Sequence, residues 1–169
     1  MAFEGLRDLL SSLDHGLLID LLALIDRETD KVDDLIAENP NADWSGAMDR
    51  AEALYGLAFV ACQQYLNCSY RFSGLERCEA VARGPMYSPS SSYAQVVDAA
   101  ANYWKHHGEW DGLGKGERKA RAVLDRLFPS RKDYPMANVL YVLLGKPAKC
   151  RVTDLVPWLE KWRNGLTTP

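Results

Sequence analysis

Apolar residues recur at steps of three and four along most of the chain. The clearest case is 17–38, where leucine, isoleucine and valine occupy one face and acidic residues occupy much of the remainder. This period predicts an amphipathic α-helix. The aspartates of its polar face are Asp20, Asp26, Asp30, Asp33 and Asp34. Asn39-Pro40 ends the helix, because proline disfavours helical geometry in the residue before it.

A second helix is predicted from Asp43 or Ser45, both good N-cap residues, to about Phe72. Its middle, ALYGLAFVACQQYL, is apolar on nearly all sides, which is typical of a helix at the centre of a bundle. The polar stripe of this helix has members four residues apart, and these are Gln63, Asn67 and Arg71. Cys62 and Cys68 belong to the same apolar helix and are expected to be packing residues.

Shorter helices are predicted over 75–83, 92–107, 117–128, 135–144 and from Thr153 onward. Ser91 or Ser92 is the expected N-cap of the helix over 92–107. No stretch alternates apolar and polar residues over five or more positions, so no strand is predicted and 83–92 is interpreted as a Pro/Ser loop. The expected fold is all-α, a single-domain antiparallel bundle of five to seven helices over residues 1–169.

Composition narrows the class of protein further. The chain has 169 residues, of which 47% are hydrophobic and 25% are charged, as in soluble globular domains. No apolar run approaches the ~18 residues needed to span a bilayer, and the first residues do not resemble a signal peptide. The four cysteines form no CxxC pair, which favours free thiols over disulfides or zinc ligands. We therefore expect a cytoplasmic protein without contact to membranes, and without cofactor or metal.

A di-iron type of metal site is the one metal alternative that the sequence raises. His106, Glu109 and Asp111 provide one or two candidate ligands near the end of the helix over 92–107. His106 and Glu109 form a His-x-x-Glu pair on this helix. Di-iron sites in helical bundles also need matching ligands from other helices, and the sequence holds no Glu-x-x-His pair that would supply them. The sequence therefore does not favour a metal site here.

The net charge of −3 hides an uneven distribution of charge. Residues 1–54 hold 13 acids and 4 bases, whereas residues 55–169 hold 10 acids and 16 bases. Seven bases gather between positions 115 and 132, namely Lys115, Arg118, Lys119, Arg121, Arg126, Arg131 and Lys132. Such a patch can bind the phosphates of RNA, with Lys115, Arg118, Lys119 and Arg121 as nucleic-acid-binding candidates. The alternative is that these bases pair with the acidic first helix or form a solvated surface.

The helix over 92–107 carries the candidate catalytic groups. Asp98, Asn102 and His106 follow one another at steps of four and therefore lie along one side of the helix. An imidazole with a nearby carboxylate is suited to proton transfer, and Lys105 is a candidate for holding a phosphate. The alternative is an ordinary solvated face. His107 continues the apolar stripe and is expected to be half-buried with its ring nitrogens hydrogen-bonded.

The segment Ala101-Asn102-Tyr103-Trp104-Lys105-His106 resembles the hallmark of the HEPN superfamily of all-helical domains, Arg-Asn-x-x-x-His. Asn102 and His106 are in register with this motif, whereas Ala101 stands at the arginine position. Many members of the family are ribonucleases of toxin–antitoxin and phage-defence systems, and their site is commonly shared between two chains. The resemblance implies a possible homodimer. Because alanine cannot hold a scissile phosphate, it also implies a relative without catalysis.

Three functions follow from these patterns as hypotheses. The first is a non-catalytic binding or regulatory protein, a degenerate HEPN-like member of a bacterial defence system whose partner is RNA or protein. The second is a metal-independent ribonuclease in which His106 acts as acid and base. The third is an acidic, immunity-type or structural interaction protein. Trp158 and Trp162, one turn apart, are expected to anchor the last helix to the bundle.

Overall fold

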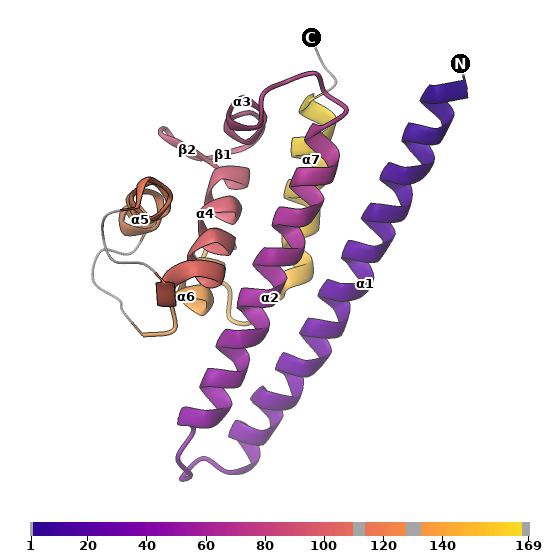
Figure 1. Ribbon diagram of the computed structural model, residues 1–169. Coiled ribbons are helices and arrows are strands. Elements are labelled where there is room, and N and C mark those ends of the chain that lie inside the picture. The colour runs from indigo at the N-terminus through magenta and orange to yellow at the C-terminus, as the bar shows by residue number, and fades with distance from the viewer. Residues whose placement is uncertain (1, 110–113, 128–132, 167–169) are drawn as a thin grey trace.

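Two long antiparallel helices run the length of the molecule (Figure 1). The computed structural model describes residues 2–109, 114–127 and 133–166, with side chains from residue 14 onward. Helix α1 spans Ala2–Glu38 and α2 spans Ser45–Tyr70, so the predicted breaks at Asn39-Pro40 and before Ser45 are confirmed, while α1 begins earlier than the periodicity indicates. The Asp43 carboxylate accepts a hydrogen bond from the Ser45 amide (3.0 Å), which fixes the entry into α2.

The segment between α2 and the next long helix holds one element that the sequence does not predict. Helix α3 (Arg77–Ala82) is followed by a small antiparallel hairpin of β1 (Met86–Ser88) and β2 (Ser91–Ser92). The prediction of a loop without strands over 83–92 is therefore wrong. Strands of three and two residues are too short to show the period-two alternation on which strand prediction depends.

Helix α4 (Tyr93–His106) begins with the predicted cap. The Ser92 hydroxyl accepts a hydrogen bond from the Gln95 amide (3.0 Å), and the Gln95 side chain accepts one from the Ser92 amide (2.9 Å). These two bonds form a capping box, which satisfies amides that a helix start otherwise leaves unpaired. Ser92, rather than Ser91, is thus the N-cap of this helix.

Three further α-helices follow in the described part of the chain, and they are α5 (Lys115–Leu127), α6 (Pro135–Leu143) and α7 (Val156–Leu166). Single 3₁₀ turns, η1 (His107–Glu109) and η2 (Val152–Leu155), follow α4 and precede α7. The prediction that Thr153 caps the last helix is wrong. Thr153 lies inside η2, and its hydroxyl donates a hydrogen bond to the Asp26 carboxylate (2.6 Å) instead.

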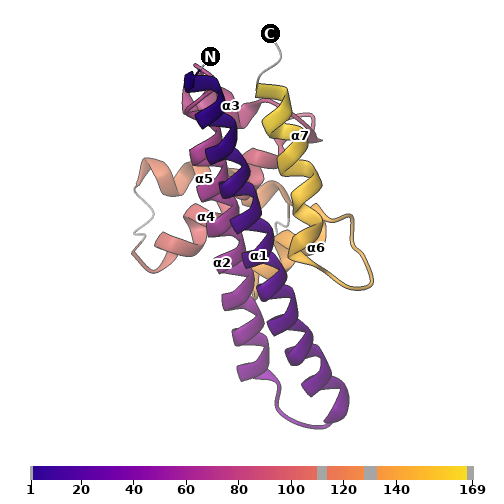
Figure 2. The same cartoon turned by 90° about the vertical axis from the view of Figure 1, so that its right-hand side faces the viewer.

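Helix α2 occupies the middle of the bundle, with α1 on one side and α4, α6 and α7 on the others (Figures 1 and 2). In the described part of the chain seven α-helices pack as one bundle with the hairpin at its side, so the predicted all-α fold is confirmed. Helix α5 packs on α4 and lies on the far side of the bundle from α1. Among the described residues, no helix combines the length and hydropathy needed to cross a membrane.

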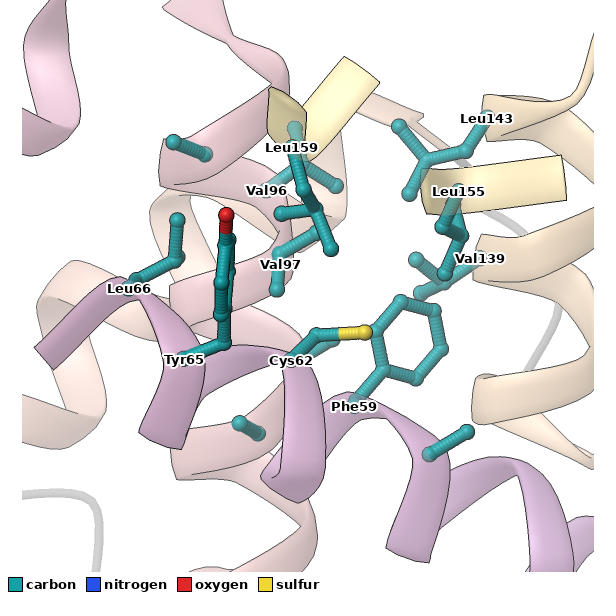
Figure 3. Close-up of a cluster of buried hydrophobic side chains, with 14 of the residues drawn as sticks. Phe59, Cys62, Tyr65, Leu66, Val96, Val97, Val139, Leu143, Leu155 and Leu159 are labelled. Carbon is teal, nitrogen blue, oxygen red and sulfur yellow. The ribbon is translucent and has the colours of Figure 1, made fainter. Parts of the chain in front are cut away.

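The core lies where α2 meets α4, α6 and α7 (Figure 3). Its labelled side chains are Phe59, Cys62, Tyr65, Leu66, Val96, Val97, Val139, Leu143, Leu155 and Leu159. Phe59 and Cys62 are completely buried, which confirms the expectation of a central helix. Burial raises the pKa of the Cys62 thiol to about 12, because the core disfavours the charged thiolate. This cysteine is a packing residue, as expected.

Helices α2 and α4 approach closely at Gly56. A Cβ atom built on Gly56 would lie 2.2 Å from the Cδ2 atom of Trp104. The indole ring therefore lies directly on the backbone of α2, in space that any larger residue at position 56 would occupy. This contact positions α4, which carries the candidate catalytic residues, against the central helix.

Two tryptophans attach α7 to the bundle, as predicted. Trp162 is buried, and its indole Nε1 donates a hydrogen bond to the Ala80 carbonyl oxygen of α3 (2.8 Å). The Trp158 ring stacks on Tyr93 at the start of α4, with the ring centroids 4.3 Å apart. The last helix is thus held at both α3 and α4.

Two buried carboxylates also join distant segments. Asp26 accepts hydrogen bonds from the Val152 amide (2.7 Å) and the Thr153 amide (3.2 Å) at the start of η2. Glu52 accepts hydrogen bonds from the first amides of α6, those of Met136 (2.7 Å) and Ala137 (2.9 Å). Burial raises the pKa of Glu52, and these two amide bonds oppose that shift. Each carboxylate caps a helical segment from another part of the chain.

Candidate functional site

A groove of about 470 Å³ lies between α3, α4 and α5. Its polar and charged lining residues include Arg77, Gln95, Asp98, Asn102, Lys119 and Arg126. We call it the α3–α4–α5 groove. Two of the predicted catalytic candidates, Asp98 and Asn102, lie on its α4 wall, and one predicted nucleic-acid-binding residue, Lys119, lies on its α5 wall.

Asp98 is the centre of a hydrogen-bond network on the α4 wall. The Arg77 guanidinium of α3 forms an ion pair with its carboxylate through Nη2, and Nη1 lies 3.4 Å from Oδ2. The Gln63 amide of α2 donates to Oδ1 (2.7 Å), and Asn102 Nδ2 donates to Oδ2 (3.3 Å). Both oxygens of Asp98 therefore already accept hydrogen bonds, which leaves this carboxylate poorly placed to take a proton from a substrate.

Gln63 ties the remaining polar groups of the network together. Its Nε2 donates to Asn102 Oδ1 (3.0 Å), and its Oε1 accepts a hydrogen bond from Lys105 Nζ (2.7 Å). Asn67, one turn further along α2, accepts a hydrogen bond from Arg77 Nε (2.9 Å). Two members of the predicted polar stripe, Gln63 and Asn67, thus contact α3 and α4, whereas the third, Arg71, is the exposed C-cap of α2.

His106 lies outside this network. Its side chain is 48% exposed, and Nδ1 lies 3.3 Å from Glu109 Oε2. It is not among the residues that line the groove, whereas Asp98 and Asn102 are. The structure thus brings two of the three members of the predicted row together in the groove, and it leaves the imidazole at the exposed end of α4.

His107 differs from its prediction in exposure. It is exposed rather than half-buried. Its Nδ1 lies within hydrogen-bond distance of the carbonyl oxygens of Tyr103 (3.2 Å) and Trp104 (3.1 Å), and its ring stacks on that of Tyr103. The apolar stripe of α4 therefore ends one turn earlier than predicted, because the chain leaves the bundle through η1.

Helix α5 presents most of the predicted basic patch. Lys115, Arg118, Lys119 and Arg121 are all exposed, while Arg131 and Lys132 lie outside the described residues. Arg121 Nε pairs with the buried Glu117 carboxylate (2.8 Å). Lys119 and Arg126 line the groove, and neither forms an ion pair with another described residue. Lys119 and Arg126 are thus the two α5 cations of the groove that are available to a bound anion.

The acidic first helix finds its bases elsewhere. Lys149 Nζ lies 2.6 Å from Asp30 Oδ1 and 3.5 Å from Asp33 Oδ2, and Arg151 Nη2 lies 3.3 Å from Asp30 Oδ2. The hydrogen bond from Lys149 lowers the pKa of Asp30, and the same bond raises the pKa of Lys149. Asp30 and Asp33 thus pair with bases near the start of η2, and not with the basic patch of α5 as the alternative interpretation expects.

Metal chemistry receives no support from the described residues, in which no three His, Cys, Asp or Glu side chains gather at one point. Asp111, one of the metal-ligand candidates, lies outside them. The four cysteines are free thiols, of which Cys78 is exposed on the rim of the groove. No known protein family, curated protein sequence or solved structure matches the chain. Function is therefore argued from the groove itself.

Sequence reasoning did not assign three residues to the site, although it placed Gln63 in a polar stripe and Arg126 in the basic patch. Arg77, Gln63 and Arg126 belong to three helices whose relative placement no local pattern records. The one available signal is the coincidence of a polar stripe on the otherwise apolar α2 with a polar row on α4. Because polar groups inside a bundle need partners, two such stripes are expected to face each other.

Proposed function

We propose that this chain is a non-catalytic binding protein that holds the phosphate backbone of RNA in the α3–α4–α5 groove. The observation that carries the proposal is the charge of the groove lining. Arg77, Lys119 and Arg126 line it together, and Asp98 is the one acid among the lining residues that the structure describes. Since the Arg77 guanidinium neutralises Asp98, the two α5 cations provide a net positive charge for phosphates.

The composition of the lining favours contacts with phosphates over recognition of bases. The amide side chains of the wall, those of Asn102 and Gln95, are already hydrogen-bonded within the protein. No aromatic side chain is among the described residues that line the groove. Bases would therefore lack both a stacking platform and free amide groups, so the expected binding depends little on RNA sequence.

The same contacts argue against the ribonuclease alternative. Acid–base cleavage needs a group that can exchange a proton within reach of the bound phosphate. His106 does not line the groove, and Asp98 and Lys105 are engaged by Gln63 and Arg77. With Ala101 at the motif arginine position, these observations support a degenerate HEPN-like protein that binds RNA and leaves it intact.

The immunity-type alternative is supported less well. It requires acids of α1 that are free to meet a basic partner. Asp30 and Asp33 are engaged by Lys149, and Asp30 also by Arg151, so that Asp20 and Asp34 are exposed acids of this helix without an ion pair to another described residue. Binding of RNA at the groove is consequently the function that the distribution of charge supports best.

Binding of labelled single-stranded RNA, measured by fluorescence anisotropy at several salt concentrations, tests the proposal. We expect the affinity to fall steeply between roughly 50 and 200 mM salt, because bound phosphates release counterions. The double variant Lys119→Glu with Arg126→Glu should weaken binding for all sequences and reduce the slope of log affinity against log salt by about 2. The RNA should remain uncleaved after prolonged incubation with the wild-type chain.

The matched control is Lys161→Glu with the same RNA. Lys161 is an exposed base of α7, away from the groove lining, and its reversal changes the net charge without touching the groove. Equal weakening by the control and by the groove variants would contradict the groove as the binding surface. Absence of any salt-dependent binding would contradict RNA as the partner. Cleavage that disappears in His106→Ala would favour the ribonuclease alternative.

A further inference from the structure

Leucines are exposed along the outer seam between α1 and α2. Leu17, Leu21 and Leu24 on α1 and Leu57 on α2 each leave between 40 and 60% of their surface exposed. We call these four residues the leucine strip. Burying one leucine fully stabilises a protein by roughly 1.5–3 kcal/mol. Four partly exposed leucines on neighbouring helices are therefore an apolar surface without a partner in the monomer.

The register of the two helices makes the strip continuous. Leu17 and Leu21 line a hollow of about 130 Å³ together with Ala61 and Gln64 of α2. Further along the same seam, Arg50 Nη2 pairs with Glu28 Oε2 (3.0 Å). Leu24 and Leu57 lie between these two points along their helices, so the α1 leucines of the strip span about two turns and Leu57 is its member on α2.

Two opposite charges flank the strip on α1. Asp20 and Arg27 are seven residues apart, close to two helical turns, so they lie on the same side of α1. Leu24 stands between them. Both side chains are exposed, and neither forms an ion pair with another described residue. The strip therefore carries an acid and a base at nearly equal distances on either side of Leu24.

We propose that the leucine strip binds a second copy of this chain, as the interface of a symmetric homodimer. A two-fold axis perpendicular to α1 near Leu24 makes the two α1 helices antiparallel and places the leucine strips against each other. This axis keeps each residue on the same side of the interface and reverses its position along the helix. Asp20 of each copy therefore lies opposite Arg27 of the other. The arrangement thus forms two ion pairs around a leucine cluster.

The charges of Asp20 and Arg27 are matched better by a second copy of the chain than by a different protein whose surface carries charges of one sign. One acid and one base at mirrored positions are complementary to themselves when the direction of the helix is reversed. A basic partner would be repelled by Arg27, and an acidic partner by Asp20. The proposal does not depend on RNA binding, since α5, which forms one wall of the groove, lies on the far side of the bundle from α1 (Figure 1).

Charge reversal in sedimentation velocity experiments tests the interface. Asp20→Arg alone places two arginines opposite each other, and Arg27→Asp alone places two aspartates opposite each other. We expect each variant alone to associate at least about tenfold more weakly than the wild-type chain. A one-to-one mixture of the two variants restores both ion pairs and should therefore recover the dimer to near wild-type affinity.

Two further variants complete the test. Leu24→Ser should abolish the dimer, whereas Ile19→Ser, which changes an exposed apolar residue on another side of α1, should leave it unchanged. Far-UV circular dichroism confirms that each variant remains helical. A wild-type chain that stays monomeric over a roughly hundredfold concentration range would overturn the proposal and leave the strip to a different protein. A dimer that tolerates Leu24→Ser, or is not recovered in the mixture, would overturn it as well.

Discussion

Buried carboxylates at single positions connect segments of this protein that are far apart in the chain. Asp26 accepts three hydrogen bonds from Val152 and Thr153, which are otherwise unpaired donors at the start of a helical segment. Hydrogen bonds to a charged acceptor are stronger than those between neutral groups, and a buried donor without a partner is costly. Asp26 therefore stabilises the attachment of the C-terminal helix to α1.

Asp26→Ala should lower the free energy of unfolding by about 2–3 kcal/mol, because it leaves the buried Val152 amide and the partly buried Thr153 amide and hydroxyl unpaired. Urea denaturation followed by circular dichroism measures this loss. Asp34→Ala, at an exposed position of the same helix, is the control and should change the stability little. Equal effects of the two substitutions would show that the buried hydrogen bonds contribute nothing beyond the loss of a helix aspartate.

The role of Asp26 could not be predicted from the sequence. It is one of five aspartates that share the polar part of 17–38, and its neighbours in sequence are like those of the exposed members. Its burial depends on Val152, which is 126 residues away. Gln63 is missed for the same reason, because its partners Asp98 and Lys105 belong to another helix. Local patterns identify polar residues but not the distant groups that they meet.

At the scale of helices, α2 and α4 approach each other closely at Gly56. The Trp104 ring occupies the space that a side chain at position 56 would fill. This contact fixes the height and rotation of α4, and with them the positions of Asp98 and Asn102 in the groove. A glycine in a helix interior costs roughly 1 kcal/mol relative to alanine, so the close contact accounts for its presence.

Gly56→Ala should destabilise the protein by about 1–3 kcal/mol, because the added methyl group collides with the indole ring. The matched control is Gly46→Ala in the same helix, where no atom lies within 4 Å of the added Cβ. This control should be neutral or stabilising, since alanine favours helix. Thermal unfolding of both variants separates the two effects, and a Gly56→Ala chain as stable as the control would contradict the packing argument.

Helices were predictable where their signals are local. The proline after Asn39, the cap at Ser92 and the glycine at position 145 all mark real ends of helices, because each acts through its own backbone or its nearest turn. The hairpin was not predictable, since its two strands are too short to show a period. The start of α7 was misplaced because Thr153 resembles a helix cap but bonds to α1 instead.

For the whole molecule, the uneven charge along the sequence becomes a separation in space. The acids of α1 gather on one side of the bundle, where Lys149 and Arg151 meet Asp30. Helix α5 with its bases lies on the far side (Figure 1). The small net charge of the chain therefore does not argue against an anionic partner. The electrostatic potential that such a partner meets depends on the charges of the face that it approaches rather than on the net charge of the whole chain.

Thiol labelling reports on the integrity of the whole bundle. Cys78 is exposed, whereas Cys62 is completely buried and its pKa is raised to about 12. We expect iodoacetamide at neutral pH to modify Cys78 in the native protein and Cys62 only when the bundle unfolds. Peptide mass spectrometry at increasing urea concentration measures both. Labelling of Cys62 as fast as that of Cys78 without urea would contradict a tightly packed core.

The hydrogen bonds of Asp26 also bear on how the protein folds during synthesis. A ribosome releases α1 early, but Val152 and Thr153 follow Asp26 by 126 and 127 residues. At ~5–20 residues per second the nascent chain spends several seconds or more with this carboxylate solvated and α1 not yet attached to α7. The attachment of η2 to α1 is thus completed only after residue 153 has emerged, whereas α2, which packs along α1, is synthesised much earlier.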